Sequence, residues 1–241
     1  MALFAPKCPI GPQERVWVEE SMAWLAAEFG REVLNRGPVL PNAEFFPGPY
    51  AGSDTDIRSM VAQLCGYLDV APDRLTIEIQ PDDGENAMVA GLRLAHESRS
   101  AAGHYRRENG RPVIAIDQRQ AARPTSLVAT IAHELGHVRL LDEQRITRAR
   151  SDHEPLTDLL TVYFGLGIFT ANSAFNFSQN SRGWSYSRLG YLSEPMFGYA
   201  LGCYAHLRGE TKPAWARHLD TNPRAYLKQS LRYLAHNPPD R

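Results

Sequence analysis

Two histidines four residues apart, with a glutamate directly after the first, are the part of this sequence best suited to chemistry. They are His133, Glu134 and His137, in the run H-E-L-G-H. Side chains four residues apart on an α-helix lie on the same face, so both imidazoles can point at one ion. Glu134 would then stand where it can take a proton from a water held at that point. Two neutral nitrogen ligands beside a carboxylate are what a hydrolytic zinc site needs, so the run predicts bound Zn²⁺.

The residues around this run have the periodicity of a helix. Apolar residues recur at helical spacing and form one stripe, namely Val128, Ile131, Leu135 and Val138. The two histidines fall on a different face of that helix. The alternative is an ordinary helix with two surface histidines and an exposed glutamate, but the clean stripe and the acidic segment that follows argue against it. We expect the helix to end in or just after the charged residues 142–145.

The next helix-like segment, residues 154–165, offers a third ligand. Catalytic zinc usually takes three protein ligands and leaves a fourth position to water. Glu154 could reach the metal, and Asp158 lies one turn later on the same face. Asp158 could accept the spare N–H of a ligand histidine and so fix its tautomer. Asp152 and His153 are rivals for the third ligand.

Together, H-E-L-G-H and the later E-x-x-x-D pattern resemble the gluzincin branch of the zincin metallopeptidases. The resemblance implies that the zinc ligands are His133, His137 and Glu154. It also implies that Glu134 is the general base of a peptidase and that Asp158 supports a ligand histidine. The expected activity is therefore hydrolysis of peptide bonds by a metal-activated water.

The resemblance is restricted to part of the chain. It covers about residues 113–165, and beyond them the chain is similar to uncharacterised bacterial proteins with the same motif, which suggest no substrate. The metzincin pattern fails, because Leu140 and Glu143 stand where it needs a glycine and a third histidine. Two other functions stay open: a catalytically silent zincin fold that binds or regulates, and a zinc hydrolase of non-peptide amides.

The rest of the sequence predicts a zincin-like α+β fold. Strands are expected at residues 75–79, 89–94, 104–106 and 113–117, with a hairpin turn at Asn109-Gly110. Further helices are expected at residues 13–34, 55–68, 193–207 and 222–234. We therefore expect a small, partly antiparallel sheet packed on the active-site helix, and a mostly helical C-terminal part.

The length of 241 residues suits a single domain. We expect residues 1–70 to form a helical N-terminal layer, residues 71–170 to form the sheet and the zinc-site helices, and residues 171–241 to form a loop and C-terminal helices. Residues 172–183 are rich in Asn, Ser and Phe and long for a connection. They are either a lid or substrate loop, or an ordinary surface loop.

A peptidase of this kind usually has a second group that stabilises the negative charge developing on the carbonyl oxygen of the substrate. Candidates lie in residues 184–191 and on the helix after them, where Tyr199 and His206 stand. Tyr191 is our first choice. Plain core packing is the alternative for each of these aromatic residues.

Composition and charge limit the kinds of partner that we expect this protein to bind. A net charge of −1 gives no general attraction to nucleic acid or to an anionic membrane. The longest apolar stretches, such as residues 159–171, are too short and too interrupted to span a bilayer. We expect no signal peptide, because residues 1–12 are brief and Pro-rich and lack an apolar h-region. Three cysteines without metal-type spacing suit the expected location in a reducing cytoplasm. The expected partner is a peptide or protein substrate, and a regulatory protein partner is left open.

Overall fold

The computed structural model describes residues 5–80, 103–180 and 192–238. The chain divides into two compact units. The helical unit comprises Met1–Phe45 and Ala149–Arg241, and the sheet unit comprises Phe46–Arg148. Helices together with a three-stranded sheet confirm the expected α+β class. The zincin fold and the single domain stay predictions.

The sheet has the strand order β1-β3-β2. β1 (Thr76–Gln80) runs parallel to β3 (Arg111–Asp117), and β2 (Gly103–Glu108) runs antiparallel to β3. Asn109 and Gly110, between β2 and β3, have positive φ values of 49° and 79°, as a tight hairpin turn requires. The expected partly antiparallel sheet is confirmed. The strand predicted at residues 89–94 lies outside the described residues.

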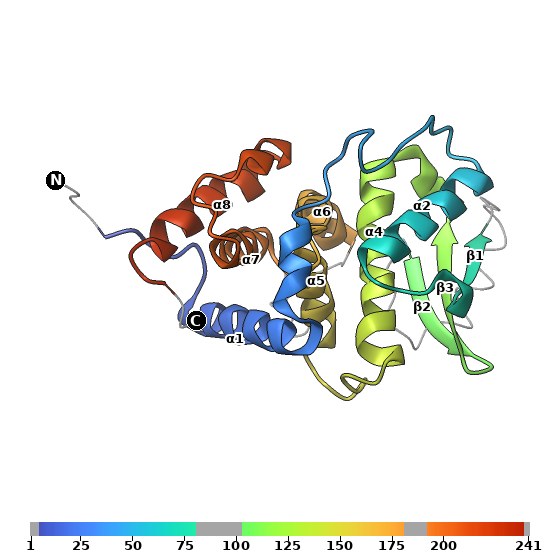
Figure 1. Ribbon diagram of the computed structural model, residues 1–241, viewed down its shortest axis with the longest axis horizontal. Coiled ribbons are helices and arrows are strands. Elements are labelled where there is room, and N and C mark those ends of the chain that lie inside the picture. Colours follow the sequence, from blue (N-terminus) through green and yellow to red (C-terminus); the bar gives the residue numbers. More distant parts are fainter. Residues whose placement is uncertain (1–4, 81–102, 181–191, 239–241) are drawn as a thin grey trace. The chain divides into compact units, whose positions relative to one another are not determined.

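Among the described residues of the sheet unit, two α-helices accompany the sheet (Figure 1). α2 (Asp54–Tyr67) begins at Ser53, whose side chain accepts a hydrogen bond from the Asp56 amide. α4 (Pro124–His137) packs against β2 and β3, and α2 packs against α4. The apolar stripe predicted for α4 is buried, with each of its four residues at most 2 % exposed. This stripe anchors α4 in the core of the sheet unit.

The helical unit is built from five α-helices among its described residues. They are α1 (Pro12–Phe29), α5 (His153–Tyr163), α6 (Gly167–Asn180), α7 (Glu194–Leu207) and α8 (Thr221–Leu234). α7 packs against α8, α1, α5 and α6. Glycine permits its close approach to α8, because a Cβ at Gly198 would lie 2.2 Å from Cβ of Tyr226. The mostly helical C-terminal part is thus confirmed over its described residues.

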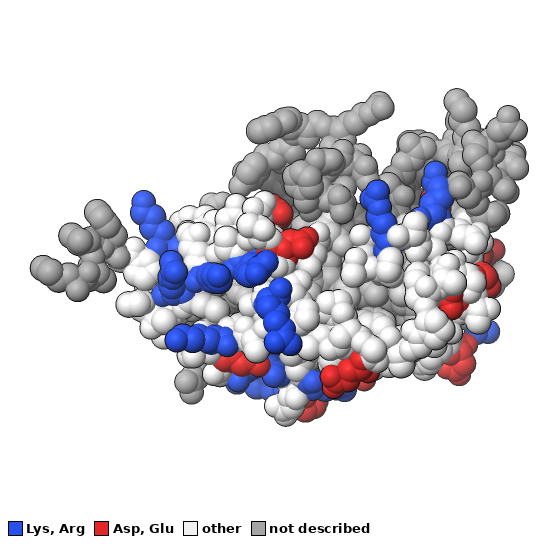
Figure 2. Space-filling model, turned by 90° about the horizontal axis from the view of Figure 1, so that it is seen from above, with Lys and Arg blue, Asp and Glu red and all other residues white. Residues whose placement is uncertain are grey.

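α8 is amphipathic. Leu227, Ser230 and Leu234 are buried, whereas Lys228 and Arg232 are exposed. Figure 2 shows basic side chains, with acidic ones among them, over the left part of the molecule, where α8 lies in Figure 1. The outer face of α8 is therefore charged and solvated.

Two predicted boundaries are wrong. The helix predicted at residues 13–34 ends at Phe29, because Gly30 has a φ of 80° and the chain continues as a 3₁₀-helix over Arg31–Arg36. Residues 172–180, predicted as a connection, belong to α6. The Asn172 side chain donates to the carbonyl of His218 (2.9 Å) and accepts from the amide of Asp220 (2.8 Å). Asn172, a residue type common in loops, therefore connects α6 to the segment that precedes α8.

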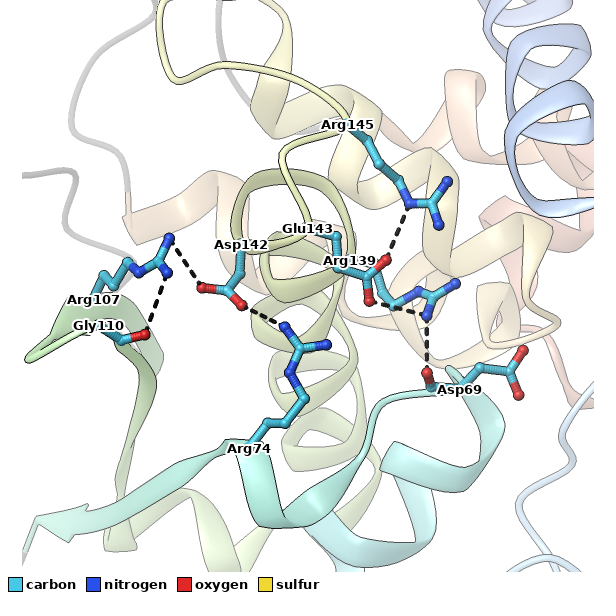
Figure 3. Close-up of polar contacts among 8 residues, drawn as sticks. All are labelled: Asp69, Arg74, Arg107, Gly110, Arg139, Asp142, Glu143 and Arg145. Atoms are coloured by element: carbon cyan, nitrogen blue, oxygen red, sulfur yellow. Dashed lines mark hydrogen bonds and ion pairs between the residues drawn. The ribbon is translucent and has the colours of Figure 1, made fainter.

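A short π-helix, Val138–Asp142, directly follows α4 and is held by ion pairs (Figure 3). The Asp142 side chain is 3 % exposed and accepts a hydrogen bond from Nη2 of Arg74 at 3.0 Å. Nη1 of Arg107, on β2, lies 3.6 Å from its other oxygen. Arg139 donates to the carbonyl of Asp69 at 2.8 Å. The segment after His137 is therefore tied to the residues before β1 and to β2.

We expect Asp142→Asn to lower the free energy of unfolding by about 1–3 kcal/mol, because it removes a buried charge from two arginines at nearly constant volume. Urea unfolding of the full chain measures the loss. Glu108→Gln is the control, since its ion pair with Arg106 is more than half exposed on the glutamate side and should be worth less than about 1 kcal/mol. Equal losses in the two variants would contradict the proposed role of Asp142.

Candidate metal centre

α4 brings the two predicted histidine ligands together. Their ring centroids lie 4.7 Å apart with the planes at 89° to each other. His133 is 5 % exposed, His137 is 7 % exposed and Glu134, between them on the helix, is 2 % exposed. The run therefore forms a nearly buried cluster of two imidazoles and a carboxylate, which is a rare environment for polar groups without a functional or structural reason.

β2 lies directly on this part of α4. Gly103 permits the close approach, because a Cβ there would lie 2.5 Å from Cγ2 of Thr130 and 3.1 Å from Cγ of Glu134. Two residues further along β2, the Tyr105 ring stacks on the His137 ring, with centroids 5.7 Å apart and planes at 29°. Alternate residues of β2 thus contact the histidine helix, as the period of a strand requires.

Tyr105 is a site residue that the sequence did not indicate. Its side chain is 7 % exposed, and the guanidinium of Arg148 lies 5.5 Å from its ring centroid. Burial, and next the nearby charge of Asp142, raise the pKa of the Tyr105 phenol. The only sequence signal was its place in a weakly predicted strand before the motif.

α5 carries the predicted acidic residues. Glu154 stands in the first turn of α5, and its Oε1 lies 3.5 Å from Nδ1 of His153. Asp158, one turn later, is 5 % exposed and accepts a hydrogen bond from the Leu192 amide at 2.9 Å. That Asp158 also orients a ligand histidine stays a prediction.

His133, His137 and Glu154 form a group that could hold a metal ion. Each offers one ligand atom, and these atoms all lie within 4.8 Å of one another. Two imidazole nitrogens and one carboxylate oxygen are a ligand set that suits Zn²⁺. The group thus fits zinc in the chemistry of its ligand atoms.

Asp152 and His153, the alternatives to Glu154, do not belong to this group. The Asp152 carboxylate accepts hydrogen bonds from Nε of Arg150 at 2.6 Å and from Nε1 of Trp17 at 2.8 Å. The bond from Arg150 is the main cause that lowers the pKa of Asp152. His153 is not one of the three residues of the group. That Glu154 is the third ligand stays a prediction.

The oxyanion candidates are only partly described. Tyr191, our first choice, lies outside the described residues, as does the rest of residues 184–191. Tyr199 is fully buried in α7, and its hydroxyl donates to Glu19 within the helical unit. Core packing therefore accounts for Tyr199.

Comparison with known proteins adds no relative. No family model, no curated protein and no solved structure matches this chain. In the parts of the chain that the structure describes, no helix has both the length and the apolar character that crossing a membrane requires.

We expect Gly103→Ala to destabilise the protein by about 1–3 kcal/mol, because the added methyl would overlap the stiff, β-branched side chain of Thr130. Thermal unfolding of the full chain measures the change. The control is Gly66→Ala on the exposed face of α2, where a Cβ meets nothing within 4 Å. That variant should gain up to about 1 kcal/mol from helix propensity. A neutral Gly103→Ala would mean that β2 can move away from α4 at no cost.

Proposed function

We propose that this protein is a zinc-dependent peptidase whose metal ligands are His133, His137 and Glu154. The observation that carries the proposal is the clustering of these three ligand atoms, with the Glu134 carboxylate next to the first histidine on α4. Burial also supports the proposal. His133, Glu134 and His137 are each at most 7 % exposed, so they are not ordinary solvated residues of a helix surface.

The chemistry divides between the metal and the chain. Bound zinc would supply Lewis acidity, which lowers the pKa of a bound water to about 7 and polarises a carbonyl. Glu134 would accept the proton of the attacking water and then deliver it to the leaving amine. The two histidines contribute neutral nitrogen ligands, and Glu154 contributes one negative charge.

The sheet provides a place for an extended peptide. Among the described strands, β2 lies at one edge of the sheet and β1 at the other. An edge strand can bind an extended peptide through main-chain hydrogen bonds. We favour β2, because Gly103 on this strand lies directly against Glu134. A peptide aligned along β2 would then pass close to the general base.

The first test separates catalysis from metal binding. Glu134→Gln should lower peptide cleavage by about 10²–10⁴-fold, because the amide cannot accept a proton, while the zinc content stays that of the wild type. Cleavage of a peptide library measures the first quantity and elemental mass spectrometry of the purified protein measures the second. Cleavage at the wild-type rate would refute the mechanism. Bound zinc without any cleavage by the wild type would instead indicate a binding protein.

The second test identifies the third ligand. Glu154→Gln should weaken zinc binding by at least about tenfold. Loss of a residue that only orients a ligand typically costs about 10–100-fold in metal affinity, and loss of a ligand should cost no less. Competition with a chromophoric chelator gives the dissociation constant. Asp152→Asn and His153→Gln are the matched controls and should bind zinc as the wild type does. A loss in either control with none in Glu154→Gln would transfer the assignment to that residue.

A further inference from the structure

We propose that Tyr105 is a positioning residue that fixes the imidazole of His137 in the orientation needed for metal binding. The inference rests on the proposed function, since it assumes that His137 is a ligand. It concerns a residue of β2 that is not part of the ligand motif. Its basis is the stacking of two planar rings from elements that are separate in sequence.

The first step is the freedom of a histidine side chain. Rotation about χ2 of histidine is broad, so an imidazole in open space samples many orientations of its plane. His137 has aromatic neighbours in two directions. The Tyr105 ring lies nearly parallel to it at 29°, and the His133 ring lies perpendicular to it at 89°. A large rotation of the imidazole plane would lose this stacked arrangement, so the Tyr105 ring favours one orientation of the His137 imidazole.

The second step is that Tyr105 is itself held in place. It is 7 % exposed, and the antiparallel register pairs it with the fully buried Ile114 on β3. Two residues before it, Gly103 is in close approach to Thr130 on α4. The Arg148 guanidinium also lies over the ring at 5.5 Å, a cation–π distance. A buried residue on a paired strand, in contact with Arg148 as well as His137, is a rigid support for a ligand.

The third step separates positioning from plain packing. If Tyr105 only fills space, its loss lowers stability and leaves the metal affinity of the folded protein unchanged. If Tyr105 orients His137, the flat aromatic ring is the part of the side chain that acts. Phenylalanine should then support metal binding as tyrosine does, although the hydroxyl and its contact with Arg148 are lost. An aliphatic side chain of similar length should fail.

The test measures the Zn²⁺ dissociation constant of the full chain by chelator competition. We expect Tyr105→Leu and Tyr105→Met to bind zinc about tenfold or more weakly than the wild type, as is typical when a residue that orients a ligand is lost. Tyr105→Phe should remain within about threefold of the wild type. Leu64→Ala is the control, because it empties a fully buried position on α2 and tests whether lost stability alone weakens binding.

A second readout does not depend on affinity or turnover. The visible absorption of bound Co²⁺, a spectroscopic substitute for zinc, should change in Tyr105→Met and be retained in Tyr105→Phe. Wild-type affinity and spectrum in Tyr105→Met would overturn the inference and leave the proposed function intact. A tenfold loss in Leu64→Ala would overturn it as well, because stability would then explain the effect. If the wild type itself binds no zinc, the proposed function fails first.

Discussion

The burial of three polar side chains on one helix is the constraint on which the rest of this structure depends. His133, Glu134 and His137 are almost fully removed from solvent. Burying such groups is costly unless partners compensate for the lost hydration. The apolar stripe on another face of α4 is buried and anchors the helix in the core. One helix thus combines a strongly stabilising stripe with a costly polar face, and the surrounding elements can be understood as supports for that face.

These supports come from segments far from the motif in sequence. β2 contacts α4 at two alternate positions, Gly103 and Tyr105. The π-helix that continues α4 is held through Asp142 by the side chains of Arg74 and Arg107 (Figure 3). α4 is therefore fixed along its side and at its C-terminal end. For the proposed metal site, such preorganisation would reduce the free-energy cost of arranging the ligands.

The regular elements could be predicted wherever a local pattern was strong. The apolar run of residues 113–116 and the apolar stripe of α4 gave the right element in each case. The prediction was wrong at residues 172–180, because this segment belongs to α6 although its composition is typical of a loop. Asn172 shows the reason most clearly, since both partners of its side chain lie more than forty residues away. Local composition does not report such partners.

The sequence by itself determined the direction of the two imidazoles, because a four-residue spacing on any α-helix places side chains on one face. It also determined that an acidic residue would open the next helix. Only the tertiary structure showed that the Asp152 carboxylate accepts hydrogen bonds from Arg150 and Trp17, and that a tyrosine ring stacks on His137. Helical spacing is a property of consecutive residues. The choice among neighbouring ligands and the contacts of a ring depend on how distant segments pack, which no local pattern specifies.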